Sequence, residues 1–270
     1  MSNKILIIQK SFPKYRDELW VLIKNSNNII FAGCGFEEQG MRISENLIFN
    51  KLNYKSFLGG KIFTIQNWKK IFLENNIISV IVTPTPRNLS LFNVLNYCKK
   101  NNITTIGYSM GPMPNKNFSQ KLFHNLFTRA LIRNIDKIIT YSSSAFDFYK
   151  YQLNYKGKLI IGHNAFTSLF DTQEERQIYF LNKKKKLQKI KKIKIGVIGR
   201  LTKNKGLEKL IYFLRKNEFE FDIEFHFFGD GPLKKIFTER NSNYKFHGFK
   251  TPEELKNILF EFNAVLVPGL

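Results

Sequence analysis

Residues 191–206 constrain the fold of this chain most, because they combine a buried strand, a glycine turn and the start of a helix. The β-branched run at 193–198 is typical of a buried strand, and Gly199 ends it. Apolar residues then recur at helical spacing over 207–214. A strand, a glycine turn and a helix in this order predict an anion pocket, since backbone N–H groups and the helix dipole both point at it.

The same turn carries two cations, Arg200 and Lys205, five positions apart. A planar guanidinium binds phosphate oxygens in pairs, and a flexible ammonium adds a point charge. The turn is therefore a candidate diphosphate site. The alternative is a solvated basic loop, because the 270-residue chain contains 43 Lys and Arg residues.

Three further strands follow this turn at helix-length intervals. Residues 226–232 read His-Phe-Phe-Gly-Asp-Gly-Pro, a strand that ends in a glycine turn. A third strand is predicted at 246–249 and a fourth at 262–268. This βαβαβαβ pattern predicts a parallel sheet that binds ligands at the carboxyl ends of its strands.

The first half of the chain repeats the alternation of strand and helix. Strands are predicted at 4–10, 29–33, 77–83, 104–108, 137–141 and 158–161. Helices are predicted at 17–24, 66–75, 89–100, 118–132 and 142–152, and one irregular strand at 54–65. The predicted fold class is α/β, with two Rossmann-like parallel-sheet domains. We place them at 1–172 and 193–270, joined by a basic linker at 173–192.

The order of motifs in the second half resembles the nucleotide-sugar domain of family-4 retaining glycosyltransferases, which have GT-B architecture. The motifs are Gly-Arg-Leu with a later Lys-Gly, then Phe-Gly-Asp-Gly-Pro, then Gly-Phe, then a strand that ends in Pro. The N-terminal half is similar to bacterial surface-polysaccharide glycosyltransferases. That likeness rests on Pro13-x-Tyr15-Arg16, Pro86-Arg87-Asn-Leu-Ser90, Thr140-Tyr-Ser142 and His163-Asn164-Ala165.

The resemblance implies a retaining, metal-independent enzyme without a cofactor. It would move a sugar from a nucleotide-diphosphate donor to a glycan or lipid-linked acceptor in cell-surface polysaccharide synthesis. The diphosphate-binding candidates are Gly199, Arg200 and Lys205. The nucleotide-binding candidates are Gly229, Asp230, Gly231, Gly248 and Phe249. The acceptor-side candidates are Tyr15, Arg16, Arg87, Ser109 and Gly111. The resemblance identifies no catalytic base.

The chain departs from the family pattern in three places. Met110 stands where these enzymes often carry a His that approaches the donor sugar, and Thr167 stands where many carry an Asp. The family's acidic motif, two glutamates eight positions apart, and its closing helices would follow the fourth strand. We therefore expect an incomplete second domain, an edge strand at 264–267, and no sugar transfer by this chain alone.

Charge and composition leave two alternatives open. A net charge of +22 favours polyanions, while 43% hydrophobic residues and 27 Phe indicate ordinary cores. The alternatives are a catalytically dead nucleotide-binding fragment and a basic nucleic-acid-binding protein. No RNA-recognition, zinc or helix-turn-helix signature accompanies the charge, so we expect no nucleic-acid partner. Two scattered cysteines and the lack of an apolar run near 20 residues predict a cytoplasmic protein.

The lysine-rich run at 183–192 is interpreted first as a solvated linker or helix, and peripheral contact with the anionic inner face of a membrane is the alternative. The alternative makes a prediction of its own. Binding to acidic vesicles should be largely lost on raising salt, because exposed charges are screened within about 8 Å at physiological ionic strength. Co-sedimentation with vesicles at low and high salt measures this. Binding that ignores both salt and acidic lipid would contradict the prediction.

Overall fold

The computed structural model describes residues 2–25, 28–35, 42–111, 118–162, 192–216, 222–234 and 244–268, with short helical pieces at 173–175, 177–178 and 181–182. The chain divides into two compact units. Unit 1 comprises Met1–Phe36 and Ile43–Phe166, and unit 2 comprises Glu37–Arg42 and Thr167–Leu270. Each unit contains a parallel sheet with helices, so the predicted α/β class is confirmed. The predicted linker at 173–192 stays a prediction.

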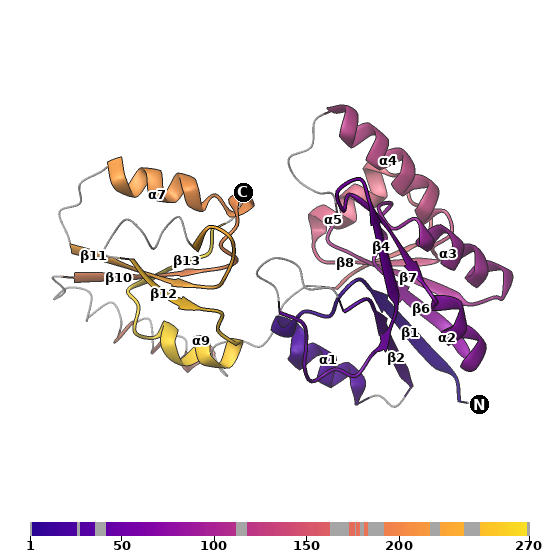
Figure 1. The fold of residues 1–270 in the computed structure, drawn as a ribbon, viewed down its shortest axis with the longest axis horizontal. Coiled ribbons are helices and arrows are strands. Elements are labelled where there is room, and N and C mark those ends of the chain that lie inside the picture. Colours follow the sequence, from indigo (N-terminus) through magenta and orange to yellow (C-terminus); the bar gives the residue numbers. More distant parts are fainter. Residues whose placement is uncertain are drawn as a thin grey trace. The chain divides into compact units, whose positions relative to one another are not determined.

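Unit 1 is built on a seven-stranded parallel sheet in the order β3-β2-β1-β6-β7-β8-β9 (Figure 1). Its strands are β1 (Lys4–Gln9), β2 (Ile29–Gly33), β3 (Asn50–Lys51), β6 (Ile77–Val82), β7 (Thr104–Ser109), β8 (Lys137–Thr140) and β9 (Lys158–Ile161). Its helices are η1 (Lys14–Arg16), α1 (Asp17–Lys24), α2 (Trp68–Glu74), α3 (Ser90–Lys100), α4 (Phe118–Ile132), α5 (Ser143–Asp147) and the π-helical turn η2 (Phe148–Gln152). The strand order reverses between β1 and β6: β2 and β3 are added on one side of β1, and β6 to β9 on the other. This is the switch point of such a fold.

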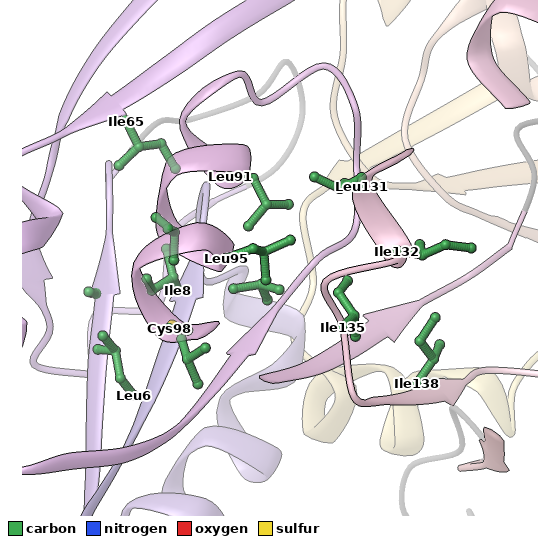
Figure 2. Packing of buried hydrophobic residues seen from close by; sticks show 14 of the residues in the cluster. Leu6, Ile8, Ile65, Leu91, Leu95, Cys98, Leu131, Ile132, Ile135 and Ile138 are labelled. Carbon is green, nitrogen blue, oxygen red and sulfur yellow. The ribbon is translucent and has the colours of Figure 1, made fainter. Parts of the chain in front are cut away.

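Alternate residues of β1 enter two separate cores. Leu6 and Ile8 pack in the larger core with Leu95 and other apolar residues of α3, as Figure 2 shows. Ile7 faces the opposite side of the sheet and packs with Trp20 of α1. A strand buried on both faces must be apolar at successive positions, which explains the unbroken run Ile-Leu-Ile-Ile in β1.

One expectation for unit 1 is corrected. Residues 54–65 form an antiparallel hairpin, β4 (Asn53–Phe57) and β5 (Ile62–Gln66), instead of one irregular strand. Leu58, Gly59 and Gly60 turn the chain with positive φ angles, which the two glycines adopt without steric cost. The helical segment predicted at 142–152 is confirmed: Ser142 is the N-cap of α5, and η2 continues the helix to Gln152.

Unit 2 contains a four-stranded parallel sheet in the order β12-β11-β10-β13. The strands are β10 (Lys192–Ile198), β11 (Asp222–Phe228), β12 (Tyr244–Gly248) and β13 (Ala264–Leu266), and the helical elements are η3 (Lys203–Lys205), α7 (Leu207–Lys216) and α9 (Pro252–Leu259). The four predicted strands are confirmed. The predicted edge position is also confirmed, because β13 pairs only with β10 in the described sheet, and Val265 is 43% exposed.

The two faces of the unit 2 sheet differ in chemistry. Val197 and Phe227 pack with Leu207 of α7 in an apolar core. The other face carries Glu224 and His226, and Figure 1 draws α9 on this side. Period-two alternation along β11 places the Phe side chains at 225 and 227 in the core and the polar ones opposite.

Glu224 anchors a polar network on that second face. It pairs with Lys245, and its Oε2 lies 3.2 Å from Nε2 of His226. Nδ1 of His226 is 2.8 Å from Nε2 of His247, and the two rings stack. Hydrogen bonds from Lys245 and then His226 lower the pKa of Glu224 to about 2. Partial burial, followed by the neighbouring His226, lowers the pKa of His247 and favours its neutral form.

Glu224→Gln should destabilise unit 2 by about 1 kcal/mol at pH 7, a modest loss because solvent screens the half-exposed Lys245. The contribution of ionised Glu224 is complete above its usual pKa of 4.5 and is lost as the pH falls toward about 2. Wild-type and Glu224→Gln stabilities should therefore converge on acidification from pH 4.5. Chemical denaturation at several pH values measures this, with exposed Glu261→Gln as the control. Curves that stay parallel down to pH 3 would disprove the assignment.

Candidate functional site

The loops that follow β10, β11 and β12 are joined by backbone hydrogen bonds at the carboxyl end of the unit 2 sheet. Gly199 N–H donates to Phe228 O at 3.0 Å, and Gly229 N–H donates to Gly248 O at 2.7 Å. Leu201 N–H donates to Asp230 O at 2.9 Å, while Leu201 O accepts from Leu233 N–H. Leu201 is also 1% exposed, so the loop that carries Arg200 is anchored in the core.

Two of the predicted glycines are required by this close approach. A Cβ on Gly229 would lie 2.0 Å from Gly199 O, and one on Gly231 would lie 2.5 Å from Leu201 O. Their φ angles are +144° and +154°, which L side chains rarely adopt. The glycines therefore bring the first and second loops within hydrogen-bonding distance.

Arg200 and Lys205 lie on the loop after β10, at the switch point of this sheet. The β10 strand pairs with β11 on one side and with β13 on the other. Ligands of open parallel sheets bind at such a point, outside the carboxyl ends of the strands. Both cations are half-buried, and Gly206, with φ +68°, connects η3 to the start of α7. The amino end of α7 thus adds its dipole to the same loop.

The remaining nucleotide-binding candidates lie on the neighbouring loops. The Asp230 carboxylate accepts from Gly231 N–H at 2.9 Å, which fixes the second glycine turn. Gly248 has φ +71° and ends β12, with half-buried Phe249 next. The fold therefore brings the backbone at residues 199, 229 and 248 close together. The diphosphate-binding and nucleotide-binding roles of these residues stay predictions.

In unit 1, Arg16 lies in an aromatic environment near the carboxyl ends of β1 and β8. Its Nη1 donates to the Tyr141 hydroxyl at 3.1 Å, and the guanidinium lies 5.5 Å from the Tyr15 ring centroid. The Tyr141 ring in turn packs 4.4 Å from that of Tyr108. Burial raises the pKa of Tyr141, so its hydroxyl stays protonated at neutral pH. Arg16 is 6% exposed, unlike Tyr15 at 47%.

Ser109 and Gly111 share one internal hydrogen-bond network. The Ser109 hydroxyl is 2.8 Å from that of buried Tyr149 and accepts from Gly111 N–H at 3.1 Å. A Cβ on Gly111 would lie 2.8 Å from that of Ala145. The glycine of the Met-Gly pair is therefore required by packing, while the Met110 side chain beside it is 70% exposed.

Arg87 is placed by its backbone on a different element. Its carbonyl accepts from Phe63 N–H of β5 at 2.9 Å, and its side chain is exposed. Residues 163–165 and Thr167, which carried part of the resemblance, lie outside the described residues. The acceptor-side roles of Tyr15, Arg16, Arg87, Ser109 and Gly111 stay predictions.

Three tyrosines of the unit 1 network were absent from the sequence-based site. They are Tyr108 at the end of β7, Tyr141 after β8 and Tyr149 in η2. Tyr108 precedes Ser109, the last residue of β7, and Tyr141 follows Thr140, the last residue of β8. These positions could have been predicted as site residues, because the carboxyl ends of parallel strands lie close together. Tyr149 comes from a helix, and only the tertiary packing brings its hydroxyl to Ser109.

The described residues include neither a cluster of metal-ligating side chains nor an exposed cysteine. Among them, no group of three or more His, Cys, Asp or Glu residues is arranged to hold a metal ion. Burial raises the pKa of the Cys34 thiol to about 11 and that of Cys98 to about 12. Both thiols therefore stay protonated at neutral pH and are poor nucleophiles.

Gly229→Ala should destabilise unit 2 far more than Gly248→Ala. Both substitutions strain a positive φ, at about 1–3 kcal/mol. Only the first also drives a methyl group into backbone, since a Cβ on Gly248 meets nothing within 4 Å. Chemical denaturation of both variants compares them, and hydrogen exchange at Gly199 reports the loop contact. Equal destabilisation would show that the loops do not meet as described.

No protein-family model and no curated protein sequence matches the chain. Among solved structures, it is similar to HepE from Anabaena in complex with UDP, with a TM-score of 0.60 and 13% identity over 96% of this chain and 71% of that one. Sucrose-phosphate synthase from Thermosynechococcus elongatus has a TM-score of 0.66 and 11% identity, with coverages of 98% and 75%.

The same fold also occurs with another activity. UDP-N-acetylglucosamine 2-epimerase from Rickettsia bellii has a TM-score of 0.54 and 14% identity, covering 99% of this chain and 74% of that one. At these identities the likeness concerns the fold. Two parallel α/β units with GT-B glycosyltransferases among their structural neighbours give this chain a GT-B-type fold of two Rossmann-like domains.

Proposed function

We propose that this protein transfers a sugar from a nucleotide-diphosphate donor to a glycan or lipid-linked acceptor. The observation that carries the proposal is the joining of three glycine loops beside Arg200 and Lys205 at the switch point of a parallel sheet. The solved neighbours support the donor class, since HepE structures contain UDP or UDP-glucose. Retaining stereochemistry, metal independence and a role in surface-polysaccharide synthesis belong to the proposal through the sequence resemblance alone.

In this proposal, the diphosphate lies against the loop at 199–205. Backbone N–H groups and the α7 dipole attract the phosphates, and Gly199 leaves room because a Cβ there would meet nothing within 4 Å. Arg200 and Lys205 neutralise the charge that grows on the leaving diphosphate, which lowers the barrier to transfer. Gly229, Asp230, Gly231, Gly248 and Phe249 line the nucleotide crevice.

The acceptor is assigned to unit 1 by the same reasoning. Its sheet also has a switch point, between β1 and β6, and Arg16 follows β1 there. Exposed Tyr15 offers an aromatic surface beside the buried guanidinium, and aromatic faces suit the apolar faces of sugar rings. We propose a cytoplasmic location, with peripheral contact with the inner face of the cell membrane.

The single substitutions Arg200→Ala and Lys205→Ala should each weaken nucleoside-diphosphate binding by about 1.5–3 kcal/mol, the scale of a charged hydrogen bond. Nucleoside without phosphate should bind equally to both variants and to wild type. Calorimetry with UDP and uridine measures the difference. The same comparison is then made with the nucleoside diphosphates and nucleosides of the other bases. Lys209→Ala provides the control, because this exposed lysine of α7 lies outside the loop.

Equal losses for nucleotide and nucleoside would disprove the diphosphate role of these cations. Incubation with a panel of nucleotide sugars and acceptor extracts then separates the activities. Transfer supports the proposal and contradicts the expectation that this chain alone does not turn over, whereas donor epimerisation replaces the proposal. Nucleotide binding without turnover agrees with that expectation and with the alternative of a catalytically dead binding protein. Tighter, salt-sensitive binding of duplex DNA would favour the nucleic-acid alternative.

A further inference from the structure

Helix α4 carries an exposed apolar face of unusual extent for this chain. Leu122, Phe123, Leu126 and Phe127 are 52%, 63%, 51% and 56% exposed. They lie in two pairs four residues apart, so they form adjacent rows on one side of the helix. The side toward the protein is defined by buried Thr128, Leu131 and Ile132. Two turns of α4 thus present four large apolar side chains to solvent.

The same row of α4 becomes basic toward its carboxyl end. Positions 122, 126 and 129 follow the spacing of one helical stripe, so exposed Arg129 continues the line of Leu122 and Leu126. The Arg129 guanidinium also donates to the Gln152 carbonyl, and exposed Arg133 lies in the turn directly after the end of α4. Residues 118–132 contain no Asp or Glu. The exposed side is therefore apolar in one half and cationic in the other.

A cavity of about 710 Å³ lies at this cationic end. Arg129, Arg133 and Lys156 line it, together with apolar Ile132 and Leu153. One carboxylate also lines it, that of Asp136, whose Oδ2 accepts from Thr105 N–H at 2.7 Å and from the Thr105 hydroxyl at 2.8 Å. Three cations against one engaged carboxylate leave the cavity positive.

We propose that unit 1 docks on a bilayer rich in anionic phospholipid through this face of α4. The four apolar side chains enter the interfacial region of the bilayer, while Arg129, Arg133 and Lys156 contact lipid phosphates. Charge favours this occupant, because a second copy would bring together two chains of +22 each. A nucleic acid would match the cations and leave the apolar rows exposed to water.

The proposed membrane contact lies on a different element from the lysine-rich run at 183–192, and it needs no helix that crosses the bilayer. In the described parts of the chain, no helix is both long and apolar enough to do so. The inference rests on the proposed function only in its purpose, which is to bring a lipid-linked acceptor to unit 1. Docking itself requires neither nucleotide nor transfer.

The experiment measures partition of the full chain onto vesicles of equal parts phosphatidylglycerol and phosphatidylcholine. The double substitution Phe123→Gln with Phe127→Gln should reduce partition by at least about tenfold. The control pair, Leu22→Gln with Leu73→Gln, removes apolar groups that are even more exposed from α1 and α2 and should leave partition unchanged. Circular dichroism and UDP binding confirm that the variants fold, and the UDP result tests the proposed function separately.

A second pair isolates the cations from the total charge. Arg133→Gln with Lys156→Gln should weaken partition onto these vesicles several-fold more than Lys24→Gln with Lys100→Gln, although both pairs leave the same net charge. All four side chains are exposed, so each pair tests position alone. Equal effects would show that binding depends on net charge and not on the position of the cations. That result would overturn the assignment to this face.

Insertion is measured with a fluorophore on Phe127→Cys, which labels selectively because Cys34 and Cys98 are buried. Vesicles should shift its emission to the blue, and a label on Leu22→Cys should not respond. The proposal is overturned if neither label responds or if neutralising 183–192 alone removes all binding. It is also overturned if the Phe123 and Phe127 variant changes only the oligomeric state in sedimentation velocity, since the face would then bind a second copy.

Discussion

Both large sheets of this chain are parallel. The helix that connects two parallel strands crosses one face of the sheet or the other, and parallel sheets are therefore covered on both faces. That requirement organises the packing of unit 1. Successive residues of β1 enter opposite cores, with Leu6 and Ile8 on one side and Ile7 on the other. The helices are then fixed by the apolar stripes that they present, as α3 does with Leu91 and Leu95.

The parallel arrangement also decides where chemistry can occur. All carboxyl ends of a parallel sheet meet at one edge, so the loops that leave them are neighbours even when they are far apart in sequence. In unit 2 this brings residues 199, 229 and 248 into a single hydrogen-bonded row. Glycine permits that approach, since a side chain at Gly229 would collide with the backbone of the first loop.

Electrostatics distinguishes the two units. Unit 2 holds a compensated network in which Glu224 is shared by Lys245 and His226 on the sheet face away from α7. Unit 1 exposes four large apolar side chains on α4, next to exposed Arg129, and water is a poor solvent for the apolar part. The first arrangement stabilises a sheet, and the second is suited to binding an anionic surface.

Periodicity alone predicted most strands and helices, because β-branched runs and helical spacing are local properties of the sequence. It failed at 54–65, where Leu58 takes a positive φ beside two glycines and the segment folds back as a hairpin. The motif order also predicted the loop glycines and the two cations, since each follows a recognisable strand.

Tertiary structure decided what the local pattern leaves open. The contact of Tyr149 with Ser109, the aromatic surroundings of Arg16 and the Glu224 network each join residues from separate elements. The exposure of α4 belongs to the same class, because an apolar stripe in the sequence predicts a helix face and not whether the fold covers it. Sequence determined which residues can form the elements, and packing determined which side chains meet and which remain in contact with water.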